Sequence, residues 1–369
     1  MVQQNNEHAQ AWTDSETLAR ALHGHEELSP SDQLALLVAQ GADRLPLPGR
    51  GHTLQRWRAL AEVAAHSLGL AKLYEGHTDA LAILYELQAD LATEGLRWAV
   101  WCAEPPGERV QATAASPDAT QRTTLQAGSA VRLSGHKPWC SGARAVDRAL
   151  VSGWLADGQR CLIAVTMDQP GIRRDDSHWQ AVGMAASASA DVHFDGATGV
   201  LVGAPGQYLS RPGFHHGGAG VAACWHGAAA RIASHLLQAV TQGGDPHRLA
   251  HLGALDVALG SAASLLREAA ADIDARPSDP CLLAVSRARL AVEAAAEDVL
   301  RRVPRAIGPG PLCKNKSLAR LMADLPVFIR QSHAERDQAA LGRLLAEMEQ
   351  ATVSTPASAP GAGAPAWTL

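Results

Sequence analysis

Two changes in the spacing of hydrophobic residues divide the 369-residue sequence into three parts. Residues 14–91 carry apolar side chains three and four positions apart, which is the spacing of amphipathic helices. Residues 96–202 instead carry short apolar runs separated by glycine, proline and aspartate, a pattern typical of strands. Helical spacing returns after Gly213 and continues to Met348. The sequence therefore predicts an α+β chain with a compact antiparallel β-barrel or sandwich between two helical regions.

We expect the domain boundaries where the pattern changes. This predicts an N-terminal helical domain at 1–95, a middle β-domain at 96–205 and a C-terminal helical bundle at 206–350. Residues 351–369 are rich in serine, proline, alanine and glycine, so a disordered tail is expected there.

Composition excludes several classes of partner. The formal net charge of -5 leaves no basic excess to neutralise phosphates, so nucleic-acid binding is not expected. We find no apolar run near the roughly 18 residues that span a bilayer, and the N-terminus is polar. The six cysteines form no CxxC pair, so no metal site is expected and a reducing compartment is favoured. A cytoplasmic enzyme or binding protein is the natural class.

Three stretches of the sequence together carry a family resemblance. They are residues 101–105 (WCAEP), 133–142 (LSGHKPWCSG) and 182–194 (VGMAASASADVHF). In order and separation they resemble three motifs of the acyl-CoA dehydrogenase superfamily: a Thr-Glu-Pro turn, Asn-Gly-x-Lys-x-Trp-Ile-Thr-Asn-Gly, and Leu-Gly-Met-x-x-Ser-x-Thr/Ser-x-x-Val-x-Phe. The resemblance covers roughly residues 50–345. It implies a flavoprotein with FAD between the middle β-domain and the C-terminal helices.

The second motif is expected to bind the flavin ring. An isoalloxazine is planar and amphipathic, so it needs an aromatic wall and hydrogen-bond donors at its polar edge. In the family the tryptophan of this motif packs against the flavin, and a hydroxyl two residues later binds near its reactive nitrogen. Carried over, these roles fall on Trp139 and Ser141, with Cys140 between them. A core tryptophan and an ordinary turn serine are the alternative readings.

The first motif and a C-terminal arginine complete the expected cofactor set. The family threonine that bonds the pyrimidine ring is Ala103 here, so only backbone contacts from Cys102 to Glu104 would remain, next to Trp101. The family also carries Arg-x-x-Phe-Gly, which reaches the FAD pyrophosphate across a subunit interface. Arg248 is the nearest equivalent, with its spacing altered by one residue, and a solvated arginine at a helix end is the alternative.

The sequence offers two positions for the catalytic base and does not decide between them. Resemblance places the family glutamate near Ser332, which points to Glu335, although Ser332-x-x-Glu335 also fits a capping box. A second family solution places the base on the first helix of the C-terminal domain, where His216 lies among glycines. His77 and Asp79 are further candidates for substrate contact, with helix capping as the favoured alternative.

The resemblance implies FAD-linked α,β-dehydrogenation of an acyl thioester or another small-molecule substrate. A flavin-dependent monooxygenase of the same fold and a non-catalytic binding or scaffold protein are the alternatives. Electron-transfer flavoprotein or a flavin reductase would be the redox partner. A homodimer or homotetramer is expected, because relatives complete their FAD site with a neighbouring subunit.

Overall fold

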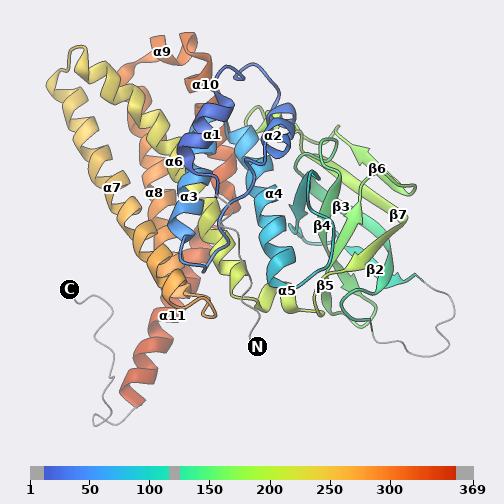
Figure 1. Cartoon of the computed structure of the whole chain (residues 1–369). Helices are drawn as coiled ribbons and strands as arrows, with labels where there is room; N and C mark the ends of the chain where they lie inside the picture. Colours follow the sequence, from blue (N-terminus) through green and yellow to red (C-terminus); the bar gives the residue numbers. More distant parts are fainter. Residues whose placement is uncertain (1–11, 116–124, 355–369) are drawn as a thin grey trace, which may run out of the picture.

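The computed structural model describes residues 12–115 and 125–354. Figure 1 shows a bundle of helices beside a barrel of strands, with helix α4 between them. Four helices precede the strands along the chain, and the remaining helices follow them. The chain thus has the predicted order of helices, β-barrel and helical bundle.

The N-terminal helices begin where short polar side chains cap free backbone N–H groups. Asp14 caps the first helix, Ser29 the second and Ser67 the fourth. The helices are α1 (Ser15–Leu22), α2 (Pro30–Ala39), α3 (Thr53–His66) and α4 (Leu68–Glu86).

Helix α4 begins earlier than the sequence pattern indicates. The apolar spacing of Ala80, Ile83, Leu84 and Leu87 predicts a helix over 77–91, but α4 starts at Leu68 and runs without a break through His77. Gly69 and Gly76 weaken the local helical signal, because glycine has a low helix propensity. In the fold they allow close packing, because a Cβ on Gly69 would lie 3.1 Å from the Ala186 side chain. Tertiary contact therefore overrides local propensity here.

Seven strands of the described chain form one sheet that closes into a barrel. Closure arises because β4 pairs with both β2 and β5 along the path β4-β2-β3-β7-β5. Most pairs are antiparallel as predicted, whereas β4 runs parallel to β1 and β2. The strands are β1 (Trp98–Trp101), β2 (Val110–Ala114), β3 (Ala130–Cys140), β4 (Arg148–Leu155), β5 (Arg160–Thr166), β6 (Ile172–Asp175) and β7 (Ala190–Leu201).

The C-terminal helices surround the long helix α6, which is rich in alanine and glycine. A Cβ on Gly227 would lie 2.1 Å from the backbone oxygen of Ala61, so α6 and α3 approach more closely than alanine permits. The helices are α5 (Gln207–Ser210), α6 (Gly213–Thr241), α7 (Pro246–Ala275), α8 (Leu282–Ile307), α9 (Pro309–Lys314), α10 (Lys316–Phe328) and α11 (Glu335–Ser354).

Two local expectations near the C-terminus need correction. The alternating glycines and prolines of residues 308–311 predict a rigid loop, but Gly308 ends α8 at a φ of +71° and Pro309 begins α9. Helix α11 extends to Ser354, past the expected tail boundary at 351. The rest of the expected tail lies outside the described residues.

Three apolar clusters hold these parts together. One fills the barrel, and one joins the N-terminal helices to α6, α7, α8 and α10. The third lies where α4 meets the barrel, with Ile83 and Leu84 of α4 against Trp98, Leu150 and Leu162 of the strands. Helix α4 therefore contacts both the bundle and the barrel, and candidate sites gather along it.

Candidate functional site

The end of β3 presents an exposed indole. Trp139 is the next-to-last residue of β3 and is 56% exposed. Its φ of +59° lies in the left-handed region, which costs a side-chain-bearing residue about 1–2 kcal/mol. Its backbone N–H donates to Asp191 Oδ1 at 3.4 Å. A large ring held open by strained backbone is a candidate ligand platform.

The turn of the third motif packs against Ser141. The Gly142 N–H donates to the Ser187 carbonyl at 2.9 Å, and the Ser189 hydroxyl donates to the Ser141 hydroxyl at 3.1 Å. In this arrangement the Ser141 proton is free to donate to a ligand. Of the six described non-glycine residues with positive φ, three lie in the second and third motifs: Trp139, Met184 and Ala188. Local strain is thus concentrated where these two motifs meet.

The first motif supports the second from inside the barrel. Trp101 is 3% exposed, and its indole N–H donates to the Ser141 carbonyl at 3.1 Å. Ser152 links Glu104 of the first motif to Lys137 of the second. Its hydroxyl donates to Glu104 at 2.7 Å and accepts from Lys137 at 2.6 Å. Burial lowers the pKa of the Lys137 ammonium despite the carboxylate 3.6 Å away. All three motifs therefore converge on Ser141 and its neighbours.

The predicted cofactor residues thus divide by position. Trp139 and Ser141 are accessible, Ala103 is exposed, and Cys102 is partly buried. Cys140 is fully buried, and its thiol donates to the Lys137 carbonyl at 3.2 Å. The buried side chains of Trp101 and Cys140 consequently hold the backbone of the second motif in place. Glu104 contributes indirectly, through its hydrogen bond to Ser152, which in turn binds Lys137.

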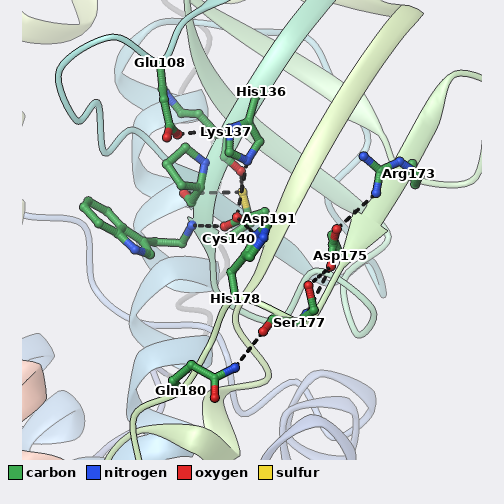
Figure 2. A network of polar contacts seen from close by, with 12 residues as sticks. Glu108, His136, Lys137, Cys140, Arg173, Asp175, Ser177, His178, Gln180 and Asp191 are labelled. Atoms are coloured by element: carbon green, nitrogen blue, oxygen red, sulfur yellow. Dashed lines mark hydrogen bonds and ion pairs between the residues drawn. The ribbon is translucent and has the colours of Figure 1, made fainter.

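A polar network that the sequence did not reveal surrounds Asp191 (Figure 2). His178 Nδ1 lies 2.6 Å from Asp191 Oδ2, and His136 Nε2 lies 3.4 Å from the same oxygen. His136 Nδ1 lies 3.0 Å from Glu108 Oε2. The His136 ring also stacks on the His193 ring, with ring centroids 4.4 Å apart. His136 and His193 are directly opposed on β3 and β7, so only strand register brings them together. The network anchors the carboxylate that holds the Trp139 backbone.

A cavity of about 760 Å³ lies between the C-terminal half of α4 and the start of α6. Its wall includes Asp79 and Glu86 of α4, His216 of α6, and Arg211 just before α6. Two loops, at residues 47–50 and 277–278, complete its rim. This volume lies in the range of small-molecule sites.

Helix capping by His77 and Asp79 is wrong, because both lie within α4. His77 is fully buried, accepts from the Trp98 N–H at Nδ1 (3.1 Å) and lies 3.0 Å from Asp43 at Nε2. Since Nδ1 accepts, Nε2 carries the proton and donates to Asp43. His77 therefore ties α4 to β1, and Asp79 is left to face the cavity.

His216 lies where the second family solution implies. It is 2% exposed, and its Nε2 donates to the Asp279 carbonyl at 2.8 Å, which leaves the Nδ1 lone pair as the basic position. Burial lowers the pKa of the His216 imidazole, with the Asp279 hydrogen bond opposing this shift. A neutral imidazole on the cavity wall is suited to accepting a proton.

Glu335 and Arg248 lie apart from this cavity. Glu335 is exposed as the first residue of α11, and the side-chain hydrogen bonds described at that turn are made by Ser332 and Asp337. The capping box with Glu335 is therefore not formed. Arg248 Nε donates to the Ala306 carbonyl at 3.1 Å, so it binds the end of α8.

Trp139 and Ser141 carry two chemical groups that an isoalloxazine requires. The indole is open rather than packed in the core, and the hydroxyl beside it has a proton to donate. Ser141 also lines a narrow crevice with Gly76 of α4 and Trp101 of β1. A flavin here would therefore have an aromatic wall and a donor at its polar edge, which are the two elements its ring requires.

Comparison with known proteins identifies the fold. No family model matches the sequence, and no curated protein matches it either. Among solved structures, TdsC, a dibenzothiophene monooxygenase from Paenibacillus sp. A11-2 in complex with FMN and indole, superposes with a TM-score of 0.71 at 18% identity, over 89% of this chain and 94% of TdsC.

Two further structures show the same likeness. KijD3, in complex with FMN and a dTDP-linked amino-keto sugar, matches with a TM-score of 0.72 at 18% identity, over 94% of this chain and 96% of KijD3. Glutaryl-CoA dehydrogenase from Mycobacterium smegmatis, in complex with FADH2, matches with a TM-score of 0.72 at 15% identity, over 90% and 94% of the two chains. The chain therefore has the acyl-CoA dehydrogenase fold, with its β-barrel between two sets of helices.

Proposed function

We propose that this protein is a flavin-dependent oxidoreductase whose flavin ring lies against Trp139. The observation that carries the proposal is the convergence of three sequence motifs on one exposed indole and one free hydroxyl. The three structures compared above contain FMN or FADH2. A bound flavin would supply the capacity to accept two electrons as a hydride and, once reduced, to react with O2.

The residues of this chain would hold that group in distinct ways. Trp139 would stack on the ring, Ser141 would donate to its polar edge, and the backbone from Cys102 to Glu104 would meet the pyrimidine end. We expect FAD, with Arg248 binding the pyrophosphate of a neighbouring subunit. The protein is expected in the cytoplasm.

The first experiment is to purify the protein and identify its bound cofactor. Flavin absorbance, followed by mass spectrometry of the released molecule, distinguishes FAD from FMN. Trp139→Ala should weaken flavin binding roughly tenfold through lost stacking, and Ser141→Ala should weaken it severalfold. Trp12→Ala is the matched control, because it removes another exposed indole, 43% exposed, at the N-terminal end of the described chain. Normal flavin retention in both site variants would refute the assignment.

We propose α,β-dehydrogenation of an acyl thioester as the reaction, with His216 as the candidate base on the cavity wall. Anaerobic bleaching of the flavin by an acyl-CoA would support it, with electron-transfer flavoprotein as the acceptor. Loss of bleaching in His216→Gln but not in Glu335→Gln would assign the base. The reverse result would return that role to Glu335.

Monooxygenation is the second candidate function, and one observation favours it. Glu335, the residue nearest the family's usual carboxylate base, is exposed and does not line the cavity. An oxygenating enzyme does not require that carboxylate. Bleaching only by a flavin reductase with NADH, followed by O2-dependent product formation, would establish this reaction. A protein that retains no flavin under any condition would instead be a binding or scaffold subunit.

A further inference from the structure

The cavity wall carries three carboxylates in different situations. Glu86 is paired with Arg211 at 2.5 Å, and Asp90 is exposed to solvent. Asp79 lies deep between α4 and α6, is partly exposed, and takes part in none of the hydrogen bonds or ion pairs found among the described residues. A carboxylate that is partly shielded between two helices and has no hydrogen-bond partner loses hydration, so its place on a cavity wall points to a ligand that donates to it.

The packing around Asp79 leaves room for its carboxylate. A Cβ on Gly217 would lie 2.9 Å from Asp79 Oδ1, so this glycine lets the carboxylate approach the α6 backbone. His216 is the preceding residue and lines the same cavity. The carboxylate and the imidazole therefore lie on neighbouring parts of one wall.

The rest of the wall is mixed, because polar groups lie among the apolar residues Leu47, Ala82 and Leu84. The Arg50 guanidinium lies over the Tyr85 ring, 5.6 Å from its centroid, and an ion pair joins Arg211 to Glu86. Gln88 and Ser278 also contribute to the lining. Hydrocarbon placed against these groups would desolvate them without replacing their hydrogen bonds.

The cavity and the Ser141 crevice both border α4. Gly76 lines the crevice with Ser141, and Asp79, three residues further along α4, lines the cavity. Three residues advance a helix by about 4.5 Å, so the two backbone positions lie within one turn of α4.

We propose that this cavity binds a small polar substrate, whose hydroxyl or protonated amine donates to Asp79 while His216 contacts it from α6. The binding proposal rests on the proposed function only for the reaction that the bound molecule then undergoes. Of the two candidate reactions it favours monooxygenation, since a compact substrate of this kind is not an acyl thioester.

Saturation-transfer NMR with three probes tests the proposal on the purified full chain. Glucosamine and glucose differ by an amine in place of a hydroxyl, and octanoyl-CoA represents a long acyl substrate. Wild type should bind glucosamine or glucose, and the preferred one distinguishes amine from hydroxyl recognition. Asp79→Asn should weaken that binding at least tenfold, because the amide cannot replace the carboxylate as an acceptor for a charged or strongly donating group.

Asp168→Asn is the matched control, because it makes the same chemical change at an exposed carboxylate that does not line the cavity, and it should leave binding within twofold of wild type. Circular dichroism confirms that each variant is folded. Equal probe binding in Asp79→Asn and wild type, or binding of octanoyl-CoA alone, would overturn the proposal, as would failure of both sugars to bind. Flavin content is measured in parallel, so that absence of flavin counts against the proposed function and leaves the Asp79 result intact.

Discussion

The Asp79 carboxylate, which we propose binds a ligand, lowers the stability of the folded chain. Burial raises the pKa of its carboxyl above 3.8, Glu75 adds to that rise, and Arg211, Arg56 and Lys72 oppose it. Because the native state then holds the proton more tightly than the unfolded chain, Asp79 destabilises the fold increasingly as pH rises from 3.8 through the folded pKa. Below 3.8 the destabilisation disappears.

Asp79→Asn should therefore raise the melting temperature at pH 7. Removing an uncompensated buried charge is worth about 1 kcal/mol or more, which corresponds to a rise of roughly 2 °C for a chain of this size. Differential scanning calorimetry across pH checks the sign, since the gain should vanish as pH falls to 3.8. A variant less stable than wild type at pH 7 would show that Asp79 has a structural partner.

Asp191 is the residue that positions Trp139. It accepts the Trp139 N–H and lies within hydrogen-bond distance of His178. Asp191→Ala should release the left-handed backbone and broaden the Trp139 signal in 19F NMR of 5-fluorotryptophan protein, with flavin affinity lowered severalfold. Asp195→Ala, an exposed carboxylate on the same strand, is the control and should leave the signal unchanged. An unchanged spectrum in Asp191→Ala would mean that the barrel alone sets this conformation.

At the scale of elements, the glycines of α6 set how closely the helices pack. Gly227→Ala places a methyl group against the Ala61 carbonyl and should cost about 1–3 kcal/mol through forced separation of α3 and α6. Gly253→Ala is the matched comparison, because nothing lies within 4 Å of a Cβ there and α7 should gain about 0.5–1 kcal/mol. Chemical denaturation of both variants measures the contrast. Similar effects of both substitutions would contradict the close approach.

At the scale of the whole molecule, α7 has an unusual surface. By length and composition alone it is the one described helix that meets the requirements of a membrane span. It packs along α8 in the bundle (Figure 1), and its outer face exposes Leu249 and Val257, which are 51% and 68% exposed. Arg248, expected to meet a neighbouring subunit, lies at the start of the same helix.

We expect this face of α7 to bind a second copy of the chain. Val257→Arg should convert the oligomer to monomers, because it places an unpaired charge in an apolar interface. Val182→Arg is the control, since this valine is 84% exposed in the segment between β6 and β7. Light scattering after size-exclusion chromatography gives the mass of each. Wild type eluting as a monomer, or Val257→Arg retaining the wild-type mass, would rule out this interface.

The order of helices, strands and helices was readable from the sequence, because hydrophobic period depends on which face of each element is buried. The motif residues were found in the same way: Trp139 and Ser141 lie in a local pattern that the chain carries without reference to distant contacts. The boundaries of α4 could not be read from the sequence, since Gly69 and Gly76 lower the helix propensity there. Only packing against the turn at Ala186 and against β1 offsets that loss of propensity.

The fold class and the local motif that contains Trp139 follow from residues that are near one another in the chain. Which charges are left unpaired depends on packing between distant segments. Asp79 and His216 are separated by more than a hundred residues and line one cavity because α4 and α6 pack together, and the His136–His193 stack exists because β3 and β7 pair in one register. Burial and pairing are properties of the assembled chain, since the low dielectric that makes a charge costly is created by residues distant in the sequence.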